Sequence, residues 1–99
     1  MSADEIAEAL NSVDGWTHDR DALTKTYEFD DFAAAIGFMA TAQPRIDELN
    51  HHPEWTNVYN RVDVRLNSHD VGGITERDFK LARLLDETCA GRGYPETPS

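Results

Sequence analysis

Three short segments between residues 47 and 78 decide the fold of this chain: Asp47-Glu48-Leu49-Asn50-His51-His52-Pro53-Glu54-Trp55, Ser68-His69-Asp70 and Gly72-Gly73-Ile74-Thr75-Glu76-Arg77-Asp78. Three of the four histidines lie in them. His51 and His52 follow a predicted helix and His69 follows a predicted strand, so a fold that joins these two element ends gathers all three. Imidazole, with an unperturbed pKa of ~6.5, exchanges protons near neutrality. The pattern therefore favours an acid–base site.

Residues 57 to 67 alternate between apolar and polar side chains, which predicts strand structure with one buried and one solvated face. Asn60 interrupts the apolar row, so a bulge or bend is expected to split the run into two strands. The apolar row consists of Val58, Val62, Val64 and Leu66.

The last helix is predicted to begin after a flexible turn at Gly72-Gly73. Thr75 and Asp78 have the spacing of a capping box, which gives Asp78 a purely structural role as an alternative. The helix would place one apolar face toward the core, made of Phe79, Ala82, Leu85 and Cys89.

A long helix precedes the paired histidines, with Asp30 or Asp31 as its N-cap. Pro44 cannot donate to the Ala40 carbonyl, so a kink or restart is expected there, and Pro53 ends the helix at or before His52. His51 and His52 could then be only C-terminal caps. The helix has two adjacent apolar stripes, wide enough for a core and an interface: Phe32, Ile36 and Met39, and Ala35, Phe38 and Ala42.

The N-terminal part is predicted to form a short helix over residues 3 to 11, capped by Ser2 and Glu5, and then a strand pair around the turn Asp19-Arg20-Asp21. Lys25 falls on the apolar side of the second strand and is expected near a sheet edge. His18 lies near the turn, where an exposed and uninvolved side chain is expected.

This order of elements predicts an α+β fold, with an antiparallel sheet of about four strands and its helices on one face. With 99 residues the chain makes one domain, expected over residues 1–91, and the tail 92–99 lacks periodicity and is expected to be disordered. The core is modest for so short a chain, so a homodimer or homotetramer is expected.

The charge balance is strongly acidic, with 19 acidic against 9 basic residues and a formal net charge of −10. Such a surface repels nucleic acid and anionic membranes, so neither is an expected partner. Adaptation to a salt-rich cytoplasm is one hypothesis, and a simply acidic protein is the other. No apolar run approaches a membrane span and no leader opens the chain, so the cytoplasm is the expected location.

Other site chemistries have less support from the residues. Three histidines are a known zinc set, but no H-x-x-x-H, HExxH or cysteine pair accompanies them, so no metal is expected. The single cysteine, Cys89, sits on the predicted core stripe, and Ser68 lacks an elbow motif, so a nucleophile is not expected. A protein-binding module remains open, because an apolar helix face can serve a partner.

Several uncommon residues recur at fixed separations along the decisive stretch. Asp47 is followed after three residues by His51-His52-Pro53, after five more by Tyr59, after nine by His69 and after eight by Asp78. This spacing resembles the signature of the pterin-4a-carbinolamine dehydratases. The likeness extends to Asn57-Val58-Tyr59-Asn60 and, in looser form, covers roughly residues 3 to 90.

The resemblance implies dehydration of a 4a-hydroxytetrahydropterin to the quinonoid dihydropterin and water, in pterin recycling, without metal or redox cofactor. It makes His51 and His69 general acids on opposite sides of the substrate, and gives His52 a role in binding and in base function. Asp47 and Asp78 would orient the histidines.

The resemblance also implies the residues that contact the pterin. These are His51, His52 and Pro53 in one segment, Ser68, His69, Asp70 and Val71 in the other, and Trp55, which core packing explains equally well.

Two positions depart from the family pattern. Asp47 stands where a longer glutamate is common, so its contact with the first histidine is expected to need a bridging water. Pro44 is unusual in this helix, which puts its angle and its subunit contact in doubt. Animal relatives also bind a homeodomain transcription factor, and nothing in this sequence indicates such a partner, so a non-catalytic interaction module on the same scaffold is the alternative function.

Overall fold

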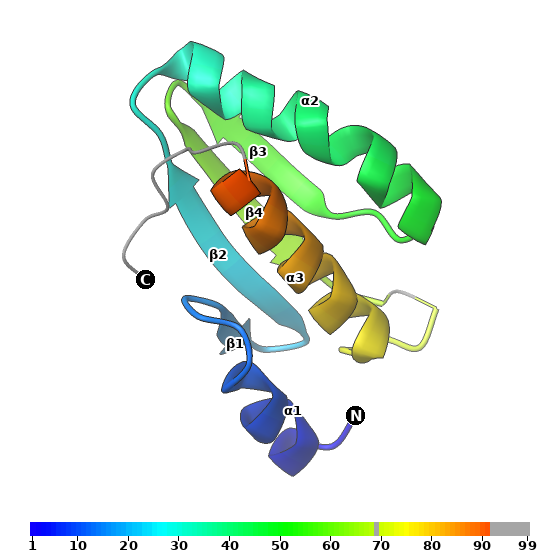
Figure 1. Cartoon of the computed structure of the whole chain (residues 1–99). Helices are drawn as coiled ribbons and strands as arrows, with labels where there is room; N and C mark the ends of the chain where they lie inside the picture. Colours follow the sequence, from blue (N-terminus) through cyan, green and yellow to red (C-terminus); the bar gives the residue numbers. More distant parts are fainter. Residues whose placement is uncertain (69, 92–99) are drawn as a thin grey trace.

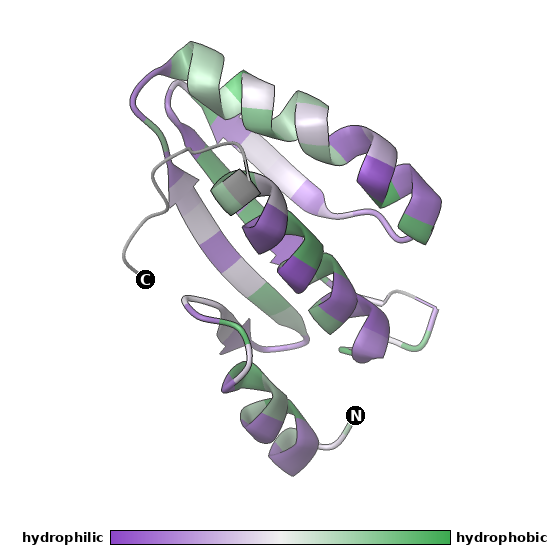
Figure 2. Ribbon diagram, in the orientation of Figure 1, coloured by the Kyte–Doolittle hydropathy of each residue, from purple (hydrophilic) through white to green (hydrophobic). Residues whose placement is uncertain are grey.

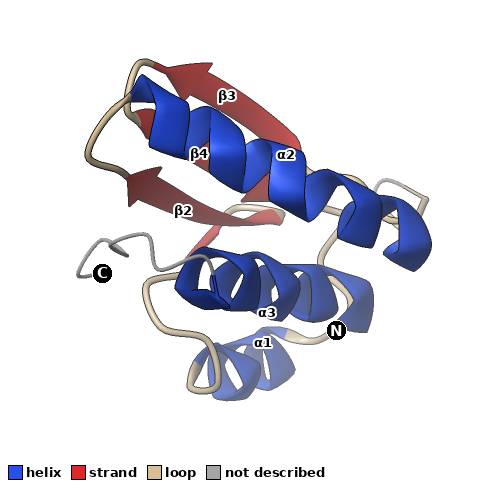
Figure 3. Ribbon diagram, turned by 45° about the horizontal axis from the view of Figure 1, so that its top comes forward, coloured by secondary structure: helices blue, strands red, loops and turns tan. Residues whose placement is uncertain are grey.

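Four antiparallel strands form a sheet in the order β1-β2-β4-β3, and the helices lie on one of its faces (Figures 1 and 3). The computed structural model describes residues 1–68 and 70–91. The predicted fold class is confirmed, whereas the predicted disorder of the tail 92–99 falls outside the described residues. In chain order the elements are α1 (Ala3–Leu10), β1 (Thr17–Asp19), β2 (Ala22–Glu28), α2 (Phe32–Leu49), β3 (Glu54–Val58), β4 (Arg61–Leu66) and α3 (Glu76–Gly91).

Side chains cap the starts of the helices, as the sequence predicted. The Ser2 hydroxyl accepts from the Glu5 amide while the Glu5 carboxylate accepts from the Ser2 amide, which completes a capping box at α1. Asp31, rather than Asp30, caps α2 by accepting from the Ala34 amide. Each cap satisfies amide groups that have no partner inside the helix, so the helix boundaries follow from local sequence.

The run from residue 57 to 67 forms a hairpin rather than a bulged strand. Its first strand begins earlier than predicted, at Glu54, and Tyr59 takes the left-handed conformation with φ 52° to make a tight turn. The split at Asn60 is thus confirmed, but Val58 does not belong to the buried row, because its side chain is 53% exposed. Because of this turn, the alternation along β3 is opposite to the predicted one. The half-buried positions of β3 are Trp55 and Asn57.

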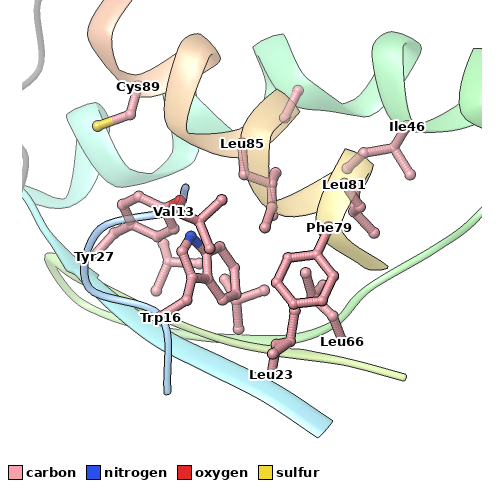
Figure 4. Close-up of a cluster of buried hydrophobic side chains, with 14 of the residues drawn as sticks. Val13, Trp16, Leu23, Tyr27, Ile46, Leu66, Phe79, Leu81, Leu85 and Cys89 are labelled. Carbon is pink, nitrogen blue, oxygen red and sulfur yellow. The ribbon is translucent and has the colours of Figure 1, made fainter. Parts of the chain in front are cut away.

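The core lies between the sheet and the two longer helices (Figure 4). Tyr27 is wholly buried there, with its ring centroid 4.9 Å from that of Phe38 on α2. Cys89 is buried as predicted. The apolar residues that α3 buries in the core are Phe79, Leu81, Ala82, Leu85 and Cys89.

The apolar stripe of α2 that contains Phe32, Ile36 and Met39 stays partly on the surface, with only Met39 packed against the core. Ala35, Phe38 and Ala42 are buried, whereas Phe32 and Ile36 are 51% and 42% exposed. Figure 2 shows that apolar residues predominate along the N-terminal half of this helix. The sheet covers only one of the two stripes.

Pro44 lies inside one continuous helix, so the expected restart of α2 does not occur. Pro44 and Ala40 are both exposed. The carbonyl that loses its helical donor therefore faces solvent, where water can satisfy it.

Lys25 is not near a sheet edge, which corrects the prediction. It lies on β2, an interior strand, and its side chain is only 1% exposed. Its ammonium group donates to the Asp86 carboxylate at 2.9 Å and to the Asp14 carbonyl at 3.0 Å, and it lies 4.9 Å from the centre of the Tyr27 ring. Asp86 also accepts from Trp16 Nε1 and from the Tyr27 hydroxyl. A buried lysine is tolerated here because α3 supplies its counter-charge.

None of the described helices is long and apolar enough to cross a membrane.

The buried Lys25–Asp86 pair should contribute measurably to stability. We expect Asp86→Ala to lower the free energy of unfolding by about 3 kcal/mol, because it removes the acceptor shared by Lys25, Trp16 and Tyr27. Lys25→Met should lower the free energy of unfolding by less, because the apolar side chain of methionine keeps much of the packing of the lysine stem. Urea unfolding measures both changes.

The exposed pair Arg45–Glu87 on α2 and α3 provides the matched control. Glu87→Gln should change stability by no more than about 0.5 kcal/mol. A loss at Asp86 as small as that at Glu87 would contradict the assignment of Asp86 as an anchor of α3.

Candidate active site

His51 lies where the end of α2 meets the start of α3. Asn50 ends α2 in the left-handed conformation, with φ 55°, and its amide donates to the carbonyls of Ile46 and Asp47. This C-cap turns the chain sharply after the helix. The turn brings His51 Nε2 to 2.6 Å from Asp78 Oδ1 in the first turn of α3. The histidine pairs with α3 rather than capping its own helix.

Asp78 is the buried centre of this site. Its side chain has no exposed surface, and that of His51 is 11% exposed. Oδ2 accepts from the Ser68 hydroxyl at 2.9 Å and from the Thr75 amide at 2.9 Å. An ionised carboxylate only accepts hydrogen bonds, so this set of donors fits the charged form and places a proton on His51 Nε2. Asp78 also completes the predicted cap of α3, so the structural and functional roles coexist.

His52 forms a second pair, on the surface. Its Nε2 lies 3.0 Å from Asp47 Oδ1, and both side chains are more than half exposed. Gln43, one turn earlier on α2, donates to the other oxygen of Asp47. The direct partner of Asp47 is thus the second histidine, and the expected water-bridged contact with the first histidine stays a prediction. Asp47 lies on the last turn of α2 beside His52, while His51 is turned toward α3.

Asp70 and Arg77 form an ion pair beside the buried centre. Arg77 Nη2 donates to both carboxylate oxygens of Asp70, at 2.7 and 2.9 Å. This contact holds the pKa of Asp70 below its usual value, with a smaller contribution from His51. Val71, next along the chain, is 63% exposed. Both predicted contact residues are thus accessible at the surface.

Trp55 is only partly available to a ligand. It is half-buried, and its ring packs at 63° against Phe38 of the core with centroids 6.4 Å apart. A concavity of about 800 Å³ includes Trp55 and Pro53. That hollow is lined mainly by outward-facing residues of the sheet, such as Thr26 and Arg65, and includes neither His51 nor His52. The concavity reaches the segment that follows the paired histidines through Pro53, but neither of the two histidines lines it.

The remaining histidines lie elsewhere or outside the described part of the chain. His18 is exposed on β1, at the opposite edge of the sheet from β3, as predicted. His69 falls outside the described residues, so its convergence with His51 and His52 stays a prediction. Within residues 1–68 and 70–91, no three His, Cys, Asp or Glu side chains are grouped as a metal site would require.

Comparison with known sequences points to one family. Residues 1–88 match the family described as Pterin 4 alpha carbinolamine dehydratase. A protein of Rhizobium leguminosarum bv. trifolii is 53% identical over 90 residues, which cover 89% of each chain. A protein of Sinorhizobium fredii is 47% identical over 94 residues, which cover 93% of this chain and 90% of that one. Both bear the provisional name pterin-4-alpha-carbinolamine dehydratase.

A solved structure agrees with the sequence matches. The crystal structure of a transcriptional coactivator/pterin dehydratase from Brucella melitensis superposes with a TM-score of 0.86 at 44% identity. The match covers 89% of this chain and 96% of that one.

The fold and the site together define a small α+β domain with histidines held by carboxylates at its helix ends. This chain belongs to the pterin-4-alpha-carbinolamine dehydratase family, whose members are hydro-lyases. The predicted family and enzyme class are confirmed at this level.

Three residues that contact predicted site residues are not indicated as functional by the sequence: Thr75, Arg77 and Gln43. Part of the signal is present, since the Thr75–Asp78 spacing predicts a cap. The contact between Gln43 and Asp47 also follows the helical i, i+4 spacing. The contact between Arg77 and Asp70 spans a loop, so no helical spacing indicates it.

The Asp70–Arg77 pair can be tested by titration. We expect Arg77→Gln to raise the pKa of Asp70 toward its ordinary value, because the largest cause of its lowering is lost. Carbon-detected NMR of the side-chain carboxyl measures the change. Glu5, whose pKa is lowered by the Ser2 amide and hydroxyl, serves as an internal control and should not move. An unchanged Asp70 titration would contradict the ion pair.

Proposed function

We propose that this chain dehydrates 4a-hydroxytetrahydropterin to the quinonoid dihydropterin and water. The observation that supports the proposal best is His51, which is held through Nε2 by a buried carboxylate. Among the described residues, Nδ1 of the same ring has no hydrogen-bond partner. The imidazole is thus fixed at one nitrogen and available at the other, as a group that transfers a proton must be.

The proposed reaction needs one proton donor and one proton acceptor. The C4a–O bond breaks, the hydroxyl leaves as water after taking a proton, and a ring nitrogen loses its proton as its electron pair forms the C=N bond. Protons balance over the reaction, and no electrons enter or leave. We therefore propose no metal or redox cofactor.

In this mechanism His51 is a general acid, and Asp78 stabilises its protonated form while holding the ring in one orientation. The His52–Asp47 pair would bind the substrate and act as base, because it is exposed and has the same carboxylate–imidazole arrangement. His69 is proposed as the second acid. The exposed Asp70 and Val71 and the half-buried Pro53 and Trp55 would contact the pterin.

Removing the acid should slow turnover without unfolding the protein. We expect His51→Ala to reduce the catalysed rate about 100-fold or more, because no other described group is held by Asp78 in the same way. The measurement is dehydration of 4a-hydroxypterin above the uncatalysed rate, with both substrate stereoisomers, in dilute and in molar salt. His18→Ala is the control and should leave the rate unchanged.

Two further results distinguish acid–base catalysis by His51 from the other possible mechanisms. Chelator treatment should leave the activity intact, and activity that one divalent metal restores would favour a metal site instead. An unchanged rate in His51→Ala with both isomers would refute the acid assignment.

A homo-oligomer is the second part of the proposal. The exposed apolar stripe of α2 supports it, because Phe32 and Ile36 would otherwise remain in water. We expect Phe32→Glu with Ile36→Glu to reduce the mass measured by light scattering to that of a monomer. Val71→Glu, at an equally exposed apolar position, is the control and should leave the mass unchanged. A wild-type monomer at micromolar concentration in both salts would contradict assembly.

The same stripe favours one alternative function, an interaction module on the dehydratase scaffold. The solved relative is described both as a coactivator and as a pterin dehydratase. A lack of dehydration above the buffer rate, in protein with native circular dichroism, would favour this alternative. Pterin recycling in the cytoplasm is proposed as the setting of the enzymatic activity.

A further inference from the structure

Ser68, which the resemblance places among the pterin contacts, has the surroundings of a buried structural residue. Its side chain has no exposed surface. Its amide donates to the Gly73 carbonyl at 2.8 Å, and its own carbonyl accepts from the amides of Val71 and Gly73 at 3.1 and 3.4 Å. These hydrogen bonds join the two ends of the loop after β4. The amide and the carbonyl of Ser68 therefore already have partners within the protein. A ligand would have to break the loop to reach them.

The Ser68 hydroxyl points instead toward the buried carboxylate. It donates to Asp78 Oδ2 at 2.9 Å and lies 2.8 Å from Thr75 Oγ1. Because the single hydroxyl proton of Ser68 is used on Asp78, Ser68 must accept from Thr75. Thr75 Oγ1 in turn accepts from the Arg77 amide at 3.3 Å. The hydrogen bonds therefore run in one direction, from the first turn of α3 through two hydroxyls to Asp78.

We propose that Ser68 and Thr75 are positioning residues for the dehydration, acting through Asp78 to hold His51 with its proton on Nε2. This inference rests on the proposed role of His51. In this proposal neither hydroxyl contacts the substrate, because both are engaged in hydrogen bonds within the protein. The Ser68 hydroxyl and the Thr75 amide occupy Oδ2, and the Thr75 hydroxyl holds the Ser68 hydroxyl in place, so that Oδ1 is the oxygen left for His51. Without them the carboxylate can rotate, and the imidazole loses its fixed partner.

The kinetic test uses Ser68→Ala. We expect kcat to fall about 10-fold or more with KM nearly unchanged, because the substrate contacts persist while the acid is displaced. In a His51→Ala background the same substitution should have no further effect on the residual rate. An equal loss in both backgrounds would overturn the proposal, since it would show a role independent of His51. Ser12→Ala, which removes an exposed hydroxyl, is the control.

Thr75 gives a matched pair of variants should Ser68→Ala fail to fold. Thr75→Val replaces the hydroxyl with a methyl group of similar volume and should reproduce the loss in kcat. Thr75→Ser keeps the hydroxyl and should restore most of it. Equal activity in the two variants would overturn the proposal.

A spectroscopic measurement tests the positioning apart from catalysis. Nitrogen chemical shifts of the His51 ring should show a single Nε2–H tautomer in the neutral wild-type protein and a mixture in Ser68→Ala and Thr75→Val. If the wild-type chain shows no dehydratase activity while these shifts change as expected, the proposed function fails and the positioning stands. An unchanged tautomer in both variants would overturn the positioning.

Discussion

A carboxylate with no exposed surface organises the functional end of this molecule. Removing a charge from water is costly unless hydrogen-bond donors surround it, so Asp78 can occupy its position only if three segments meet there. His51 comes from the end of α2, Ser68 from the end of β4, and the Thr75 amide from the start of α3. The same contacts that make burial tolerable fix the histidine. Stability and the proposed chemistry therefore depend on one set of hydrogen bonds.

Toward the other end of α3, a second carboxylate also gathers hydrogen-bond donors from distant segments, but it anchors the helix rather than a histidine. Asp86 gathers Lys25 from β2, the indole of Trp16 and the hydroxyl of Tyr27 around one partly buried carboxylate. These three partners are donors from the sheet or the N-terminal segment, and none of them is a histidine. Asp86 thus ties α3 to the sheet, whereas Asp78 ties it to a group that can exchange protons. A single helix links the packing of the domain to the geometry of the site.

The two histidine pairs are chemically alike but differ in environment. The pair of His51 and Asp78 is largely enclosed, and the pair of His52 and Asp47 is in water. Solvent screens the exposed pair and leaves its side chains free to move, while the enclosed pair keeps one orientation. This difference supports a division in which one histidine is a fixed acid and the other is an adaptable binding group.

The sequence by itself determined the order of the elements and the starts of the helices, although β3 begins earlier than its alternation indicated and Pro44 does not interrupt α2. Caps at Ser2, Asp31 and Thr75, the stop after Leu49 and the break at Asn60 act within a few residues of themselves, so local pattern is sufficient to locate them. The spacing of Asp47, His51, His52 and Asp78 was likewise enough to indicate the family, which the comparisons then confirmed.

Only the tertiary structure decided which partners these residues take. Lys25 looked like an edge residue because its counter-charge, Asp86, lies 61 positions away in sequence. The direct partner of Asp47 is the second histidine rather than the first, since the turn at Asn50 sends adjacent side chains to different elements. The sequence does not indicate the hydrogen bond from Ser68 to Asp78, because a hydroxyl looks the same in sequence whether it faces a substrate or a buried carboxylate. Burial and pairing across distant segments depend on how helices and sheet pack, and short-range periodicity does not encode that packing.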